Sequence, residues 1–407
     1  MFWRKIKLKN RLDYLSSKRG NIKMANKPKI WTKDFIGITI INLLIFMGFQ
    51  MLMPTLPLYV KSLGGADSVI GWITGLTTIS ALIIRPVSGV AVDKWGRKVI
   101  LLVGIGLIIT ATLSYWWFPY VGVILAIRFL HGFGWGLSST SSNTVATDVI
   151  RKERFGESMG YFSLSSGVAM AIAPGIGLAL FAGGNASNLM FTSAGFGAIA
   201  FCLALFFRYH TIERQQVEKK KAAIFERSSM RPALVMFFIS AAYGPIVSFL
   251  SIYALEKGIA NIGMYFFVYA AAMLVTRPIF GRLVDRLGFN ATMYPGLILL
   301  IIAMVILSQA STMLIFLFVA LLYGIGFGAV QSSLQTLAVI YAPKDRLGAA
   351  NATFFTGFDG GIGFGSIVAG IASSVLGYNW MYLTFALFPV LAGIFFFFTS
   401  GKTKKAE

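Results

Sequence analysis

Apolar stretches of about 20 residues follow one another along most of the chain, and each could cross the ~30 Å hydrocarbon core of a bilayer as a helix. Membrane-spanning strands would need shorter segments of alternating polarity, which the sequence lacks. We therefore expect an all-α integral membrane protein with twelve transmembrane helices. Their approximate bounds are 34–58, 69–91, 99–118, 120–143, 157–181, 188–208, 232–255, 262–281, 291–309, 312–340, 349–374 and 379–399.

The composition agrees with a membrane location. Hydrophobic residues make up 57% of the chain and charged residues only 13%. Soluble domains carry about 25% charged residues. Most of the surface must therefore face lipid.

A motif in the first half of the chain returns in the second half at a constant offset of 192 residues. Arg85, Pro86, Gly89, Asp93 and Gly96 return as Arg277, Pro278, Gly281, Asp285 and Gly288. Gly132, Gly134 and Gly136 return as Gly324, Gly326 and Gly328, and Arg154 and Gly156 return as Arg346 and Gly348. A register kept over about seventy residues indicates that the two halves are copies of one unit.

This repeat divides the twelve spans into two bundles of six helices. The expected order is a basic N-terminal tail (1–33), a first bundle (34–208), a charged linker (209–231), a second bundle (232–399) and a C-terminal tail (400–407). We expect the linker to be solvated and the protein to be a monomer.

The formal net charge of +21 would suit either nucleic-acid binding or a topology signal. Lys61 and Lys257 fall on one side of the predicted membrane, and Arg85, Arg128 and Arg277 fall within or at the ends of spans. The other basic residues fall on the opposite side. The positive-inside rule makes that side cytoplasmic, with both termini on it. We therefore expect a multi-pass protein of a bacterial inner membrane that contacts lipid and binds no nucleic acid.

Signatures of catalysis and metal binding are missing from the sequence. It contains no Walker A motif, no nucleophile elbow and no cluster of metal ligands, and His131 and His210 are its only histidines. We expect neither an enzyme nor a cofactor nor a metal site.

The loop after the second predicted span reads Gly89-Val-Ala-Val-Asp93-Lys-Trp-Gly96-Arg97-Lys98. It resembles the loop signature of the major facilitator superfamily, Gly-x-Leu-Ala-Asp-Arg-x-Gly-Arg-Lys, and a weaker copy contains Gly281, Asp285 and Gly288. The resemblance implies the fold of that superfamily and a cytoplasmic latch that holds the outward-open state. A positively charged turn that only sets topology is the alternative. Asp148 resembles an acid that joins this latch in related exporters, but it could equally be a solvated loop charge.

The fourth predicted span contains Leu125-Ala-Ile-Arg128-Phe-Leu-His131-Gly132-Phe-Gly134. It resembles the motif Leu-x-x-x-Arg-x-x-Gln-Gly-x-Gly of proton-coupled drug exporters, in which the arginine tunes proton transfer. A buried arginine is costly unless it is paired or hydrated, so Arg128 is a functional candidate. His131 shares a helix face with Arg128 and could carry a proton near neutral pH. A neutral histidine that makes one hydrogen bond is the simpler alternative.

The fifth predicted span carries Gly160, Ala173, Pro174 and Gly177. This pattern resembles the antiporter signature of the superfamily, which ends Gly-Pro-x-x-Gly-Gly, with Ala173 in place of one glycine. Proline bends a helix because it removes a backbone hydrogen bond, and small neighbours let the bent helix slide against a partner. Ser366 occupies the position equivalent to Pro174, so the bend is confined to the first half, which favours export over uptake.

Asp359 is the acid expected well inside a span, at a depth of ~15 Å. A carboxyl group there exchanges a proton when its surroundings alternate between wet and dry, as a proton-coupled antiporter requires. Its repeat equivalent is Gly167, so the fold does not demand an acid at this position. A hydrogen-bonded structural carboxyl group and a site for a cationic substrate are the alternatives.

The resemblance also implies a central cavity lined by spans 1, 4, 7 and 10. Polar and aromatic side chains on these spans are candidates to line it: Asn42, Phe46, Gln50, Ser138, Ser142, Tyr243, Ser248, Ser251, Tyr323, Gln331 and Gln335. Each alone is more often a contact between helices. As a set they suit moderately hydrophobic substrates better than phosphorylated ones.

The sequence thus predicts a transporter that exports a small organic molecule in exchange for protons by alternating access. The resemblance is strongest to bacterial drug/proton antiporters. The stretch from Met53 to Lys61 also resembles exporters of sugars and opine metallophores. A narrow-substrate metabolite exporter, a proton-coupled importer, and a receptor or scaffold that transports nothing are the alternatives.

Overall fold

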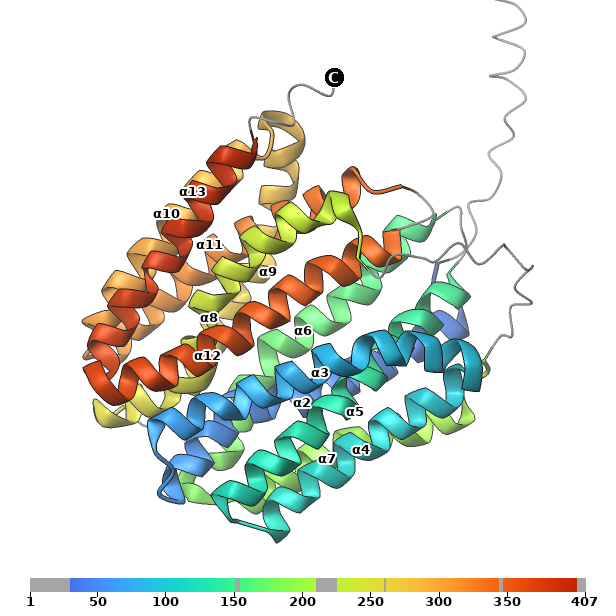
Figure 1. Cartoon of the computed structure of the whole chain (residues 1–407), viewed down its shortest axis with the longest axis horizontal. Coiled ribbons are helices and arrows are strands. Elements are labelled where there is room, and N and C mark those ends of the chain that lie inside the picture. The colour runs from blue at the N-terminus through green and yellow to red at the C-terminus, as the bar shows by residue number, and fades with distance from the viewer. Residues whose placement is uncertain (1–29, 151–153, 210–224, 260, 344–346, 401–407) are drawn as a thin grey trace, which may run out of the picture.

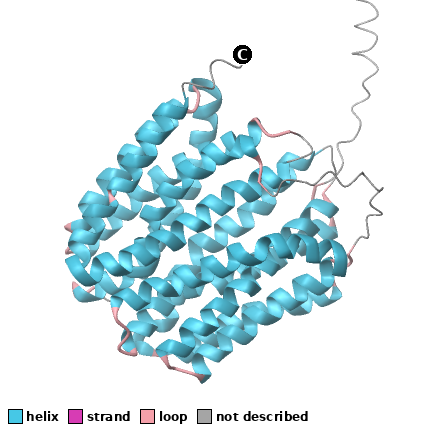
Figure 2. Cartoon of the chain, viewed as in Figure 1, coloured by secondary structure: helices cyan, strands magenta, loops and turns pink. Residues whose placement is uncertain are grey.

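The computed structural model describes residues 30–150, 154–209, 225–259, 261–343 and 347–400, and every long element within them is a helix (Figure 2). The first half contains α2 (Lys33–Ser62), α3 (Asp67–Trp95), α4 (Arg97–Trp117), α5 (Val121–Val149), α6 (Phe155–Phe181) and α7 (Ala186–Phe206). The second half contains α8 (Met230–Glu256), α9 (Gly263–Leu287), α10 (Asn290–Ser308), α11 (Met313–Ile340), α12 (Leu347–Phe385) and α13 (Leu387–Ser400). Most of the predicted tails and linker lies outside the described residues.

Ten segments of the described helices are long and apolar enough to cross a membrane. One of them, Ala349–Phe398, holds two predicted spans because the chain turns at Gly377, whose φ of 75° suits glycine. Figure 1 shows α13 running back alongside the second half after this turn. The predicted eighth span lies on α9, of which Gly263–Thr276 is a shorter apolar stretch. The predicted all-α membrane fold is therefore confirmed.

The repeated glycines make equivalent contacts in the two halves. A Cβ atom on Gly134 would lie 2.9 Å from the carbonyl oxygen of Gly104, and one on Gly326 would lie 2.8 Å from that of Gly296. These distances are too short for any side chain. Glycine therefore lets α4 pack closely on α5 and α10 pack closely on α11 in the same way. The sequence repeat is thus a repeat of helix packing.

Helices α2 to α7 lie together on one side of the molecule and α8 to α13 on the other (Figure 1). We call the end of the molecule that carries the α3–α4 turn at Gly96 the basic end. The end that carries the α2–α3 turn at Gly64 and the turn at Gly377 is the opposite end.

The two halves pack tightly toward the opposite end, mainly through α3 and α12. Gly71 faces the backbone of Ser366, and Gly363 faces the side chain of Thr78, so a Cβ atom on either glycine would clash. At the very end, the Tyr378 hydroxyl donates a hydrogen bond of 2.8 Å to Asp67. A second contact between the halves joins α6 to α9. This end of the molecule is therefore closed.

Toward the basic end the packing loosens. Gly89 on α3 and Gly160 on α6 have no heavy atom within 4 Å of the position that a Cβ atom would take. Val87 and Val90 on the same part of α3 are 54% and 67% exposed. No described helix therefore approaches closely at Gly89, the first residue of the loop signature, in this structure.

Candidate functional site

A pocket lies between the two halves near the middle of the molecule. Its wall is mostly apolar and aromatic, with Phe49, Met53, Trp135, Pro174, Val247, Phe266, Phe358 and Ile362 among the lining residues. Polar groups come from Gln50, Thr77, Thr78, Tyr243 and Asp359. Such a wall suits a moderately hydrophobic ligand that a few polar groups orient.

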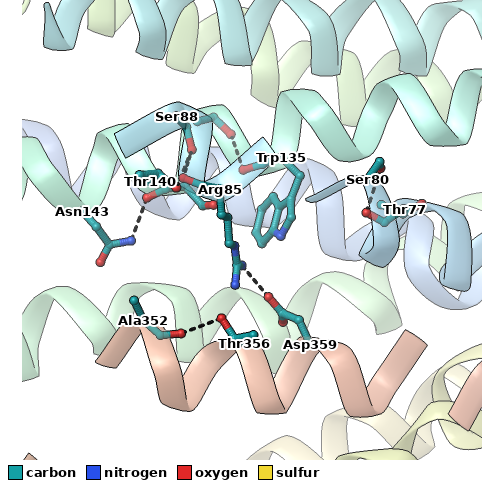
Figure 3. Close-up of polar contacts among 12 residues, drawn as sticks. Thr77, Ser80, Arg85, Ser88, Trp135, Thr140, Asn143, Ala352, Thr356 and Asp359 are labelled. Atoms are coloured by element: carbon teal, nitrogen blue, oxygen red, sulfur yellow. Dashed lines mark hydrogen bonds and ion pairs between the residues drawn. The ribbon is translucent and has the colours of Figure 1, made fainter. Parts of the chain in front are cut away.

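Asp359 forms an ion pair with Arg85 across the boundary between the halves. Arg85 Nη2 on α3 lies 2.5 Å from Asp359 Oδ2 on α12, and the side chains are 21% and 22% exposed. Figure 3 shows the two side chains pointing toward each other from facing helices. The pair lies one helical turn from the tight packing at Gly363, on the side of the basic end.

Close packing of α12 on α8 fixes the direction of Asp359. Gly357 lies against the backbone of Ala233, and Gly361 lies against the backbone of Phe237. Because these two glycines share a helix face that is buried on α8, the side chain between them in the sequence is turned toward α3. The run of glycines around Asp359 therefore positions the acid.

Arg85 is a site residue that we noted only as part of the repeated motif. The signal for it was present, because it is a basic residue placed at a predicted span in a chain whose other half carries an intramembrane acid. Pairing it with Asp359 required the relative placement of the two halves, since the residues are 274 positions apart.

Arg128 and His131 lie in a buried cluster within the first half. Both are 0% exposed. The Arg128 guanidinium lies 5.9 Å from the centre of the Phe49 ring and 6.0 Å from that of Tyr115. His131 Nδ1 lies 2.9 Å from the Tyr115 hydroxyl, the kind of hydrogen bond that the simpler sequence interpretation requires. None of the contacts described for this cluster is to an acidic side chain.

The predicted latch residues are only partly described. Arg97 Nε donates a hydrogen bond of 2.9 Å to Asp148 Oδ2, which joins α4 to α5 within the first half. Gly96 has φ of 91° and its repeat equivalent Gly288 has φ of 80°, values that suit glycine. Lys98 is exposed. Gly281 lies on α9, and the side chains of Asp93 and Asp285 lie outside the part that the structure describes.

The predicted antiporter residues lie on α6. Ala173 is buried, and Gly177 packs against the backbone of Met51 on α2. Pro174 lies inside the helix and lines the central pocket. Its neighbour Gly175 packs against the Phe267 ring on α9, so the proline-containing segment forms the second contact between the halves.

Of the predicted cavity residues, Gln50 and Tyr243 line the pocket. Phe46 packs edge-on against Trp135, which is itself a pocket residue. Tyr323 lies behind Tyr243, with ring centres 6.1 Å apart. These aromatic side chains form the wall and the layer directly behind it.

Three other predicted cavity residues, Asn42, Ser142 and Ser248, hold helices together instead. Ser142 donates to Asn42, and Asn42 donates to Ser165, which ties α5, α2 and α6 together. Ser248 bonds with both Thr74 and Ser366 at 2.9 Å and so links α8 with α3 and α12. Ser138, Ser251 and Gln331 are buried, Gln335 is half-buried, and these four are not among the residues that line the pocket.

The sequence of this chain matches the family model of the Major Facilitator Superfamily over residues 38–362, with a second match over 233–407. The chain belongs to this superfamily. It is therefore a membrane transporter of small molecules and not an enzyme. Among the described residues no group of three or more His, Cys, Asp or Glu side chains could hold a metal ion.

Relatives with more specific names cover nearly the whole chain. The staphylopine export protein of Staphylococcus aureus is 24% identical over 395 residues, which are 92% of this chain and 98% of that protein. The multidrug resistance protein MdtG of Citrobacter koseri is 28% identical over 351 residues, 80% of this chain and 84% of that protein. Among solved structures, an inward-facing bacterial homologue of the lysosomal transporter Spinster superposes with a TM-score of 0.76 at 15% identity, covering 92% of this chain and 99% of that one. That likeness supports the fold alone.

Proposed function

We propose that this transporter exports a small, moderately hydrophobic organic molecule in exchange for protons, and that Asp359 carries the proton. The observation that carries this proposal is the Arg85–Asp359 ion pair, which lies at the central pocket and joins the two moving halves. Burying an ionisable group within a membrane is energetically costly, so such groups are rare and usually have a function.

The membrane orientation follows from the positive-inside rule. Helix α2 begins and α13 ends at the basic end, and the sequence assigns most of the basic residues outside the spans to the same side, so this end faces the cytoplasm. In the structure the halves are closed at the opposite end, which then faces the outside of the cell membrane. About a fifth of the Arg85 side chain and of the Asp359 side chain is exposed. We infer that water reaches this exposed part from the cytoplasmic side.

Alternating access couples the proton to the substrate as follows. In this scheme the described state, with Asp359 paired to Arg85, is the one that follows release of the proton to the cytoplasmic side. Opening of the opposite end separates Gly363 from Thr78, one turn away, and lets external water reach Asp359. Asp359 takes up a proton there and is no longer held by the charge of Arg85. The return of the halves carries the proton inward, after the substrate has left outward.

Export is favoured over uptake by two features. Pro174 lies within α6, whereas the equivalent position in α12 is Ser366, which agrees with the resemblance of the first half alone to the antiporter signature. Relatives that cover most of the chain are named as an export protein and as multidrug resistance proteins. The first of these names keeps the narrow-substrate exporter as the second candidate. The latch at Arg97 and Asp148, and a role of Arg128 and His131 in proton transfer, stay predictions.

The test is efflux from cells that are loaded separately with a cationic, a neutral and an anionic fluorescent dye. We expect efflux of at least one dye that stops when the proton gradient is collapsed and that Asp359→Asn abolishes. The matched control is Glu256→Gln, which removes an exposed carboxylate at the end of α8 and should leave efflux unchanged. Efflux that persists without a gradient, or in Asp359→Asn at equal expression, would contradict the proposal.

A further inference from the structure

The guanidinium of Arg128 is buried without a partner for its charge. Its Nε and Nη1 atoms have no hydrogen-bond partner among the described residues. Nη2 lies 3.7 Å from the thioether sulfur of Met53, a weak acceptor, and the neutral Tyr115 side chain is a further hydrogen-bond partner of the guanidinium, so neither contact supplies a negative charge. The Phe49 and Tyr115 rings compensate only part of a buried positive charge.

A second polar group in the same cluster is also unsatisfied. His131 Nε2 is buried and has no partner in the part of the chain that the structure describes. Buried polar atoms are nearly always paired, with protein or with a ligand. Unsatisfied nitrogens from two neighbouring side chains on one helix face therefore indicate a polar group that the described residues do not supply. For Arg128, whose guanidinium nitrogens can only donate, this group is an acceptor.

The cluster lies directly behind the wall of the central pocket. Phe49, Met53 and Thr77 line that pocket. Phe49 and Met53 are also the side chains that contact the Arg128 guanidinium from this side. Methionine is flexible and has no branched carbon, so its side chain can turn aside at small cost. A ligand in the pocket is thus separated from Arg128 by one layer of side chains.

The charges around the pocket also favour an anionic ligand. Arg85 is neutralised by Asp359. The charge of Arg128 has no described counterpart, so these three residues carry one net positive charge. The repeat equivalents of Arg128 and His131 are Ala320 and Tyr323, so the fold does not require a cation at this place.

We propose that Arg128 binds the carboxylate of the transported molecule, which reaches it when Met53 and Phe49 turn aside. The substrate class is then that of small organic carboxylates with an apolar body. Arginine suits this role because its planar guanidinium binds a carboxylate through two parallel hydrogen bonds. The proposal rests on the proposed transport function but not on the proton site at Asp359.

The test compares two probes that differ only in the carboxylate: dansyl-leucine and its amide. Dansyl fluorescence reports the binding of each probe to the purified full-length protein in lipid nanodiscs, with no proton gradient. We expect the carboxylate to bind about tenfold more tightly than the amide, as charge-assisted hydrogen bonds imply. Arg128→Met should reduce this preference to about twofold or less and leave amide binding in place. The control Arg231→Met removes an exposed arginine at the start of α8 and should keep the preference.

A second measurement covers the case in which Arg128→Met does not fold. Thermal melting of the wild-type protein should be shifted upward by dansyl-leucine and much less by its amide, and chloride should not reproduce the shift. Equal binding of the two probes, no binding of the carboxylate, or stabilisation by chloride alone would each overturn the proposal. So would an unchanged preference in Arg128→Met. Because binding needs no gradient, these outcomes are independent of whether Asp359 couples efflux to protons.

Discussion

The two halves of this transporter share their helix packing but not their chemistry. Gly132 on α5 faces the carbonyl oxygen of Thr77, and its equivalent Gly324 on α11 faces that of Tyr269, which is the residue equivalent to Thr77. At the preceding residue the equivalence ends, because the position of His131 is taken by Tyr323. Residues that build the bundle are repeated, and so is Arg85 as Arg277, whereas Arg128, His131 and Asp359 have no charged or titratable counterpart of the same kind in the other half.

Asp359 shows the same difference at the contacts between the halves. The α3–α12 contact carries the Arg85–Asp359 pair, while α6 has Gly167 at the position equivalent to Asp359. The α6–α9 contact instead carries Pro174 and the packing of Gly175 on Phe267. We infer that one contact handles charge and the other provides a bent surface that can slide.

The largest expected effect comes from the shared packing. Gly132→Val and Gly324→Val should both abolish folded protein, because each new side chain would meet a backbone carbonyl that cannot move aside. Gly106→Val is the control, since nothing lies within 4 Å of a Cβ atom there. The yield of monodisperse protein in detergent measures the effect. Folded protein from only one of the two valine variants would show that the close glycine contact is required in one half but not in the other.

The next effect separates the stability of the ion pair from its coupling role. Arg85→Met should lower the free energy of unfolding by about 1–3 kcal/mol, because it leaves Asp359 without its partner. The double variant Arg85→Met with Asp359→Met should recover most of that loss, yet remain unable to couple efflux to protons. Thermal melting and dye efflux measure the two properties. A double variant no more stable than Arg85→Met would argue against a simple pair.

Removal of the unpaired charge should act in the opposite direction. Arg128→Met should raise the free energy of unfolding by about 1–3 kcal/mol, because the lost guanidinium has no described acceptor for two of its nitrogens. Arg85→Met is expected to lower the free energy of unfolding, so Arg85→Met and Arg128→Met should shift the stability of the protein in opposite directions. Melting curves in one detergent give the comparison. Destabilisation by Arg128→Met would mean that the charge is compensated in the resting protein.

The smallest effect is expected at the predicted latch. Arg97→Gln removes the charge of a partly buried pair within the first half but keeps a side chain that can donate to Asp148, so it should lower the free energy of unfolding by only about 1 kcal/mol. Efflux should fall only about two- to threefold, since the pair does not cross between the halves. Initial efflux rates at matched expression measure this. A loss as complete as that of Asp359→Asn would show that the latch matters more than its described contacts indicate.

Much of the fold could be predicted from the sequence because its determinants are local. Apolar length located the spans, and the constant offset of glycines located the repeat. Helix ends were less accurate: α5 continues to Val149 although its span was predicted to end near 143, because polar residues such as Asn143 and Thr144 still hydrogen-bond within the helix. The tight turn at Gly377 was also within reach, since glycine separates the two predicted spans there.

The site was predictable only as separate residues. Asp359 and Arg128 were found because charge inside a membrane is rare. The neighbouring sequence did not indicate which of the two side chains forms an ion pair. For Asp359 the outcome depends on how the halves meet, which pairs it with Arg85, and for Arg128 it depends on the packing of α5 on α2, which places Met53 against the guanidinium. Ser248 and Asn42 were expected at the cavity but hold helices together, because a polar side chain in a membrane is satisfied equally well by either use.

The most direct test of the account compares uphill with downhill transport in proteoliposomes. The purified protein is reconstituted, and transport of a dye exported by cells is followed with and without an imposed proton gradient, in the wild type and in Asp359→Asn. The account predicts that Asp359→Asn still equilibrates the dye down its own gradient but loses proton-driven accumulation by about tenfold or more. Accumulation at the wild-type level in Asp359→Asn would contradict the central claim that Asp359 carries the proton.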